Sequence, residues 1–97
     1  MNEVKIFENT EFGEIRTVTI NNEVWFVAKD VADILGYQNG SRDINRHVEE
    51  EDRNKVMIFD GNQDKETITI NESGLYCLIL SSKMPNARKF KRWVTSE

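Results

Sequence analysis

The sequence is poor in the residues that most often carry chemistry in small proteins. It has one cysteine, Cys77, and one histidine, His47. A single cysteine excludes an internal disulfide and a cysteine-rich zinc site. Cys77 lies within an apolar stretch, which favours a buried structural thiol over a reactive one. His47 ends a polar segment with no serine or cysteine nucleophile motif beside it, which disfavours a catalytic role.

Long apolar runs are also missing. The longest, near Leu78–Leu80, is far too short to cross a membrane. The N-terminus does not place a basic start before an apolar stretch, so it does not resemble a signal peptide. There is no glycine-rich phosphate loop. We therefore expect a protein of the reducing cytoplasm, without membrane contact, bound metal or cofactor.

The residues that are present suit one small domain. The chain has 97 residues, of which 38% are hydrophobic, and this is enough for a single core. Apolar residues alternate in Ile15–Ile20 and resume in Val24–Val27 after the dipeptide Asn21–Asn22, a pattern typical of a β-hairpin. Val4–Glu8 alternates more weakly and is predicted to be an opening strand.

A second hairpin is predicted later in the chain. Lys55–Phe59 and Glu66–Ile70 are both rich in strand-forming residues, and they flank a loop of Gly, Asn and Asp. Glu49–Asp52, just before it, is a run of four acidic residues. We interpret this run as a solvated turn.

The remaining segments follow the helical period. Lys29–Leu35 is predicted as one helix and Ser41–Val48 as a second, with Ser41 as its cap. Asn71 is placed to cap a third helix, and Pro85 to open the last, where its missing N–H costs nothing. We therefore predict an α+β fold, a small single domain of antiparallel β-hairpins packed with about four short helices. The predicted core residues are Trp25, Phe26, Leu35, Leu75, Leu78, Ile79, Phe90 and Trp93.

Asp30 and Asp33 are the candidate catalytic carboxylates. They are three residues apart, so both lie on the same side of the predicted helix. Such a pair can bind a metal or share a proton. On the outer side of a short helix it more often keeps the helix soluble, and Asp30 also suits the helix N-terminus. We expect both side chains to face solvent, and we expect the protein not to be an enzyme.

Charge is strongly segregated along the chain. Lys83–Trp93 carries five positive residues and no acid, and since the whole chain has a charge of −4, the remainder carries −9. This separation indicates a surface directed at an anionic partner, and double-stranded DNA is the first candidate. Complementing the helix dipole explains one or two basic residues near a helix end, but hardly five. The predicted phosphate contacts are Lys83, Arg88, Lys89, Lys91 and Arg92.

Lys29–Val48 predicts a helix, a turn and a second helix. In DNA-binding proteins this motif places the second helix in the major groove. Here the second helix would present Arg42, Asn45 and Arg46, and Arg pairs with guanine edges as Asn does with adenine edges. The match is loose, because Gly36–Gly40 makes a turn longer than the usual length of about 3–4 residues.

Three ordered blocks resemble a known family. They are WF-x-A-x-DVA-x-x-LGY within Val24–Tyr37, NE-x-GLY after Ile70, and A-x-x-F-x-x-WV near the end. Together, from about Phe7 to Glu97, they resemble the BRO-N domain, the N-terminal part of phage and prophage antirepressor-like proteins and of baculovirus BRO proteins. The resemblance implies a DNA-binding domain of viral or prophage origin, followed by a different C-terminal domain. If the origin is a prophage, the protein is expected in the cytoplasm of a bacterial host.

The leading hypothesis is therefore a DNA-binding domain of an antirepressor-like regulatory protein. The alternative is a protein-interaction module that sequesters a phage repressor, because the net charge of −4 and an acidic surface including Glu49–Asp52 could mimic DNA. A two-fold homodimer would double the phosphate contacts of so small a domain, although the sequence does not indicate which face would pair. We expect residues 1–97 to begin a longer protein, since no helix stop signal follows Val94.

Overall fold

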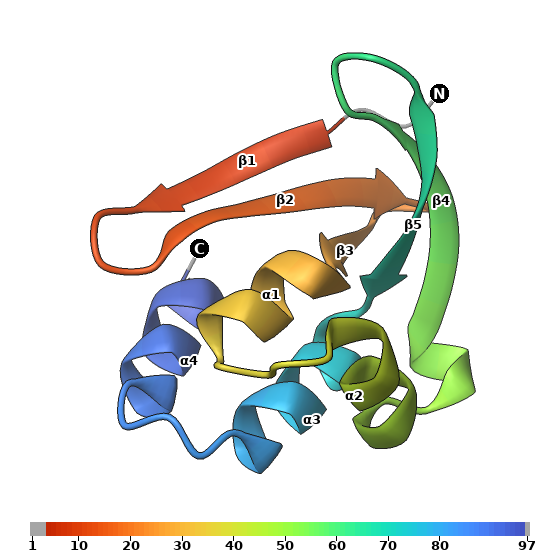
Figure 1. Ribbon diagram of the computed structural model, residues 1–97. Coiled ribbons are helices and arrows are strands. Elements are labelled where there is room, and N and C mark those ends of the chain that lie inside the picture. Colours follow the sequence, from red (N-terminus) through yellow and green to blue (C-terminus); the bar gives the residue numbers. More distant parts are fainter. Residues whose placement is uncertain (1–3, 97) are drawn as a thin grey trace.

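The computed structural model describes residues 4–96, and these form one sheet with helices beside it. The strands are β1 (Val4–Asn9), β2 (Gly13–Ile20), β3 (Glu23–Val27), β4 (Arg53–Phe59) and β5 (Asp64–Ile70). They pair antiparallel in the order β1-β2-β3-β5-β4. Figure 1 shows the β4–β5 ribbon running at a steep angle to β1 and β2.

The helices lie together on one side of the sheet (Figure 1). They are α1 (Ala28–Ile34), α2 (Gly40–His47), the short 3-10 helix η1 (Glu50–Asp52), α3 (Glu72–Ser81) and α4 (Ala87–Ser96). An antiparallel sheet packed with these helices confirms the predicted α+β class. Both predicted hairpins and the opening strand are also confirmed.

The turn between β2 and β3 fixes the register of the first hairpin. Asn21 and Asn22 have φ angles of 52° and 66°, and a type I′ turn requires positive φ at both central residues. Ile20 therefore pairs with Glu23 beside the turn, and Val18 pairs with Trp25 further along. Because successive side chains of a strand point to opposite faces, this register decides which residues reach the helices.

The apolar residues of the sheet are divided between its two faces. On the helix side, Ile15, Phe26 and Ile70 are buried among side chains of α1, α2, α3 and α4. On the other side, a second and smaller cluster contains Val18, Val27, Val56 and Ile58. Six of the predicted core residues are buried as expected: Phe26, Leu35, Leu75, Leu78, Ile79 and Phe90.

The two tryptophans depart from the predicted core. Trp25 is half-buried against the second cluster, because it alternates with Phe26 and so points to the opposite face. Trp93 is half-buried at the margin of the main core, where its ring stacks on that of Phe12 with centroids 5.8 Å apart. Phe12 lies in the β1–β2 turn and meets Phe90 edge-on at 5.5 Å. These rings join the β1–β2 hairpin to α4.

An asparagine side chain caps the N-terminus of both α2 and α3. The prediction that Ser41 caps α2 is wrong, because the Asn39 side chain accepts the hydrogen bond from the Arg42 N–H at 3.3 Å. An amide oxygen can serve as an N-cap as well as a hydroxyl. Asn71 caps α3 as predicted, accepting from the Gly74 N–H at 2.9 Å.

The start of α4 also differs from the prediction. Pro85 does not open the helix but lies in the turn before it, because the Ala87 N–H donates to the carbonyl of Met84 at 3.2 Å. The first helical bond of this region runs from the Phe90 N–H to the carbonyl of Asn86, at 2.9 Å. Proline's fixed φ suits the turn as well as a helix start, so the residue alone does not decide between them.

Candidate nucleic-acid interface

The basic side chains of α4 point away from the core because its apolar residues repeat with the helical period. Phe90 and Val94 are four residues apart and buried. Arg88 and Arg92 are also four apart, and both are exposed. Their spacing relative to Phe90 puts them on the opposite side of the helix. They form a pair of guanidinium groups one turn apart, directed at solvent.

Lys89 and Lys91 are exposed on the flanks of this pair. The Lys91 ammonium nitrogen lies 5.9 Å from the centre of the Tyr76 ring on α3. This contact is a cation–π interaction, and it keeps the charge beside the junction of α3 and α4.

Lys83 is exposed on the segment between α3 and α4, and that segment is held in place by hydrogen bonds. The Ser82 hydroxyl donates to the carbonyl of Leu35 at 3.0 Å. The same oxygen accepts from the Met84 N–H at 3.2 Å. Lys83 therefore stands on an anchored turn at the edge of the basic surface.

The predicted reading residues on α2 are exposed too. Ile44 is the buried residue of α2. Arg42, Asn45 and Arg46 of the same helix face solvent. The Asn45 side-chain oxygen, however, accepts a hydrogen bond from the guanidinium of Arg53 at the start of β4. Arg53 thus adds a positive group beside α2. The sequence carried no signal for it, because the contact depends on how β4 packs next to the helix.

The acidic run that follows α2 divides into two parts. Glu49, Glu50 and Glu51 are exposed, as the prediction of a solvated turn requires. Asp52 is half-buried, and its carboxylate accepts from the Asn71 side-chain amide at 3.0 Å. The Asp52 carbonyl also accepts from the Asn71 N–H at 3.1 Å. Asp52 therefore fastens η1 to the start of α3, and three carboxylates remain beside α2.

The predicted DNA contacts are not neutralised by other side chains. Among residues 4–96 the ion pairs are Arg16–Asp30, Lys29–Asp33 and Lys55–Glu66. None of the eight predicted contacts forms an ion pair with a described residue. The positive charge of the seven Arg and Lys residues among them therefore stays available to an external partner.

The structure does not bring these eight residues onto one surface. α2 and α4 both contact α3, and Figure 1 shows them on opposite sides of it. The result is two separate basic surfaces. The first, which we call the α4 surface, comprises Lys83, Arg88, Lys89, Lys91 and Arg92. The second, the α2 surface, comprises Arg42, Asn45, Arg46 and Arg53.

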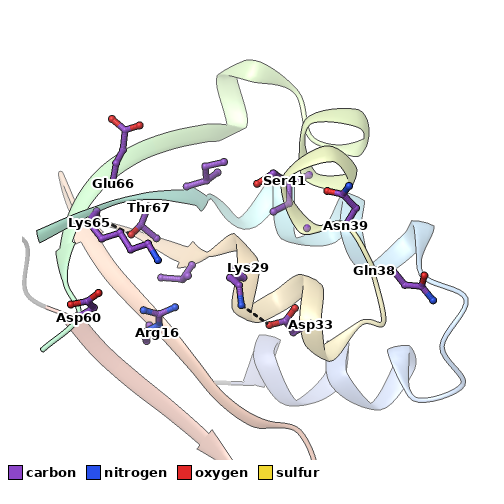
Figure 2. Close-up of a pocket in the computed structure, with 14 residues that line it drawn as sticks. Arg16, Lys29, Asp33, Gln38, Asn39, Ser41, Asp60, Lys65, Glu66 and Thr67 are labelled. Atoms are coloured by element: carbon purple, nitrogen blue, oxygen red, sulfur yellow. Dashed lines mark hydrogen bonds and ion pairs between the residues drawn. The ribbon is translucent and has the colours of Figure 1, made fainter. Parts of the chain in front are cut away.

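A cleft lies elsewhere, between α1, the start of α2 and the β4–β5 ribbon (Figure 2). It has a volume of about 650 Å³. Its charged lining is balanced, with three basic and three acidic side chains: Arg16, Lys29, Lys65, Asp33, Asp60 and Glu66. Two of the basic groups are already paired, Lys29 with Asp33 and Arg16 with Asp30. This balance gives the cleft no preference for an anion such as phosphate.

Asp30 itself does not face solvent, so the expectation that both helix carboxylates do is wrong for this residue. Its carboxylate is engaged by Arg16 at 2.9 Å. Asp33 is exposed as expected and pairs with Lys29 one helical turn away at 3.3 Å. Within residues 4–96 no group of three or more His, Cys, Asp or Glu side chains is arranged to hold a metal ion. Over the same residues, every helix is too short or too polar to span a bilayer.

These features define a small single-domain α+β protein with two separated basic helix surfaces. The chain belongs to the Bro-N family: the model of the BRO family, N-terminal domain, matches residues 14–97. The resemblance carried by the three sequence blocks is thereby confirmed.

Relatives occur in a bacterium and in large viruses. A protein of Haemophilus influenzae is 37% identical over 75 residues, which cover 77% of this chain and 37% of that protein. A Bro-N domain-containing protein of Acanthamoeba polyphaga mimivirus is 38% identical over 86 residues, covering 77% of this chain and 35% of that protein. A Bro-N domain-containing protein of Invertebrate iridescent virus 6 is 30% identical over 88 residues, covering 72% of this chain and 21% of that protein. The chain thus spans well under half the length of these relatives. No solved structure is significantly similar to it.

Proposed function

We propose that this domain binds double-stranded DNA, chiefly through phosphate contacts made by the α4 surface. One observation carries the proposal. Five basic side chains, all exposed and none in an ion pair with a described residue, lie in a stretch from Ser73 to Ser96 that contains no acid. Phosphate contacts of this kind supply affinity without reading the sequence.

The α2 surface is proposed as the weaker, sequence-reading part. Arg42 and Arg46 are one helical turn apart and exposed, so their guanidinium groups can reach base edges. Asn45 has less freedom, because Arg53 holds its side-chain oxygen. The carboxylates of Glu49–Glu51 repel phosphate on this side and limit how closely α2 can approach a duplex.

Family membership supports the wider role that we propose, a regulatory protein of the antirepressor-like kind, active in the cytoplasm of an infected or lysogenic cell. In this role the domain binds and does not catalyse. Incubation of the protein with duplex DNA and Mg²⁺ should leave the DNA uncut. Cleavage that disappears in the Asp30→Ala variant would contradict this part of the proposal.

The DNA proposal is tested by titrating a fluorescent duplex at several salt concentrations. Binding should weaken as salt rises, and the double variant Arg88→Glu/Arg92→Glu should bind more weakly with a salt slope smaller by about two, because each lost phosphate contact removes about 0.9 from the slope. The charge-matched control is Lys5→Glu/Lys29→Glu, whose residues are exposed but lie outside both basic surfaces. Absence of binding at low salt, or equal effects of the two double variants, would overturn the proposal.

The reading role of α2 needs a separate experiment. Duplexes selected from a random pool by the wild type should share a motif. Selection with Arg42→Ala/Arg46→Ala should lose that motif, since each bidentate base contact is worth about 1–3 kcal/mol of discrimination. Motifs that are identical in the two selections would assign base readout to another element.

A second candidate function rests on a different observation. Besides Glu49–Glu51, the β1–β2 hairpin places Glu8 directly opposite Glu14, with Glu11 exposed in the turn. Like charges at paired positions destabilise a sheet, so their presence favours an external cationic partner such as the DNA-binding face of a phage repressor. Under this alternative, the domain captures the cognate repressor after nuclease treatment. Changing Glu49, Glu50 and Glu51 to Gln should then abolish capture.

A further inference from the structure

β4 is an edge strand that is protected by charge only in its first half, where Lys55 is exposed. It is last in the sheet order, so one of its two sides has no strand partner. It has seven residues, four of them a continuous apolar run, Val56–Phe59. Met57 and Phe59 are 50% and 56% exposed. Natural edge strands are usually short, charged, bulged, interrupted by proline or covered, because a free edge pairs readily with another strand. The run Val56–Phe59 has no charge and no proline.

Alternation along the sheet decides which backbone groups of β4 are free. A two-residue turn is closed by a hydrogen-bonded pair, here Ile20 and Glu23. Hydrogen-bonded and non-hydrogen-bonded residue pairs alternate along two antiparallel strands. The backbone N–H and C=O groups of successive residues therefore point alternately to the strand on one side and to the strand on the other. Followed through β3 and β5, this alternation directs Val56 and Ile58 toward β5. The N–H and C=O groups at the free edge therefore belong to the intervening residues Lys55, Met57 and Phe59.

We propose that β4 is the interface of a two-fold homodimer, in which the β4 strands of two copies pair antiparallel with Met57 at the axis. In this register Met57 faces Met57, and Lys55 of each copy faces Phe59 of the other. All three residues have free edge groups, so every new backbone bond has a donor and an acceptor. On the opposite face, Val56 of one copy meets Ile58 of the other and extends the second apolar cluster across the dimer.

The side chains that would face one another support this register. Within one copy Phe59 pairs with Asp64 of β5, so the proposed pairing puts Lys55 of the second copy in the same cross-strand row as Phe59 and Asp64. A register one pair away, centred on Val56, would instead oppose Asn54 to the apolar Ile58. Apolar side chains that face each other stabilise neighbouring strands, and Lys55 keeps Glu66 of its own copy as its ion-pair partner at 3.7 Å.

β1, the other edge strand, is a poorer interface. A two-fold pairing centred on Ile6 would put the Glu8 carboxylate against Val4, and one centred on Phe7 would put it against Ile6. Either pairing would also bring together the two acidic hairpins, in each of which Glu8 already faces Glu14. A second copy therefore fits β4 and is repelled from β1.

An antiparallel two-fold pairing has its axis perpendicular to the sheet, so the helices of both copies lie on the same face of a continuous ten-stranded sheet. The α2 and α4 surfaces are thereby duplicated on one side of the dimer. The inference does not depend on DNA binding, because dimerisation is measured in the absence of DNA. A protein that dimerises but ignores DNA, or binds DNA as a monomer, would separate the two proposals.

The first test is sedimentation of the purified protein over a range of concentrations. The wild type should show a monomer–dimer equilibrium. Met57→Lys places two like charges at the axis and should raise the dissociation constant more than about tenfold. Ile6→Lys is the matched control, an equally exposed apolar residue (52%) on the other edge strand, and it should leave the constant unchanged. A wild type that stays monomeric at NMR concentrations, or a loss of the dimer only in Ile6→Lys, would overturn the proposal.

The second test fixes the register. In a Cys77→Ser background, Met57→Cys should be joined to its counterpart by a short bismaleimide, because residues at the axis of a bonded pair have Cα atoms about 5.5 Å apart. Phe59→Cys and Ile6→Cys should react with a monofunctional maleimide but should not give covalent dimers. Efficient crosslinking through Ile6→Cys, with none through Met57→Cys, would move the interface to β1. Circular dichroism of each variant confirms that it is folded.

Discussion

On the β3 side of β2, where Arg16 lies beyond the last paired residue, the carboxylate of Asp30 takes the place of a strand partner. One carboxylate oxygen accepts from the Arg16 backbone N–H at 3.0 Å and from its Nε at 2.9 Å, and the other oxygen accepts from Nη2 at 2.9 Å. β3 ends at Val27, and the chain turns into α1 at this point. Asp30 therefore ties the first turn of α1 to β2. The side-chain hydrogen bond that Arg16 donates to Asp30 raises the pKa of Arg16 above its usual value, against the opposing effect of partial burial.

Removing this carboxylate should destabilise the fold. Asp30→Ala leaves the Arg16 N–H and guanidinium without their partner, and we expect a loss of about 2 kcal/mol in the free energy of unfolding. Asp33→Ala is the matched control on the same helix. Its pair with Lys29 is largely exposed, so we expect a loss below about 0.5 kcal/mol. Urea unfolding of both variants measures the difference, and equal losses would show that Asp30 does not have this structural role.

The β2–β3 turn should respond to its backbone preference. Asn22 has a φ of 66°, which glycine adopts freely and alanine does not. Asn22→Gly should leave stability unchanged or raise it by up to about 1 kcal/mol, and Asn22→Ala should lower it by about 1 kcal/mol. Asn62→Ala, in the loop of the other hairpin, has no positive φ to lose and should be close to neutral. Thermal melts of the three variants test this order of stability.

Gly74 should resist the substitution that usually strengthens a helix. Gly74 is buried in the first turn of α3. A Cβ added there would lie 2.9 Å from a Val48 methyl carbon and 3.0 Å from the Ile70 Cβ. Gly74→Ala should therefore cost about 1–3 kcal/mol through overpacking. Gly40→Ala, at the start of α2, meets no atom within 4 Å and should be neutral or stabilising by up to about 1 kcal/mol. If urea unfolding instead shows that Gly74→Ala is more stable than the wild type, the side chains of Val48 and Ile70 can shift to accommodate the added methyl group.

Asp60 should make the β4–β5 loop sensitive to acid. Backbone hydrogen bonds from Gln63 and Asn62 hold the pKa of this carboxyl below its usual value. A lowered folded-state pKa contributes stability above the unfolded value of about 3.9, and that contribution is lost as the pH falls through the folded value. An NMR titration of the Asp60 carboxyl carbon should give a midpoint below the usual value of about 3.9. Asp60→Asn keeps an accepting oxygen and should remove this part of the acid dependence of unfolding, whereas an unchanged dependence would contradict the assignment.

Much of the fold could be predicted from local patterns. Asn21–Asn22 between two alternating segments specified the first hairpin, because only a few residue types accept its positive φ angles. Asn71 specified the start of α3 through its capping hydrogen bond. The spacing of Phe90 and Val94 likewise predicted which side of α4 is buried. Each of these features is decided by residues within a few positions of one another.

Other predictions failed or stayed incomplete where distant segments meet. Asp30 was expected to face solvent, yet a residue fourteen positions earlier engages its carboxylate. Trp25 was assigned to the main core, but the pairing of β3 turns it to the second cluster. Arg53 was missed because its contact with Asn45 exists only once β4 lies beside α2. Whether the eight predicted contacts bind DNA stays a prediction.

The sequence by itself determined the elements, their buried sides, the separation of charge and the family, because periodicity, capping and short motifs act over a few residues. Only the tertiary structure decided that the basic residues form two surfaces on either side of α3, and that β4 is left at the edge of the sheet with Met57 and Phe59 exposed. The physical reason is the strand order. β5 pairs with β3 across an insertion that contains α1, α2, η1 and β4, and that long-range pairing places β4 outermost.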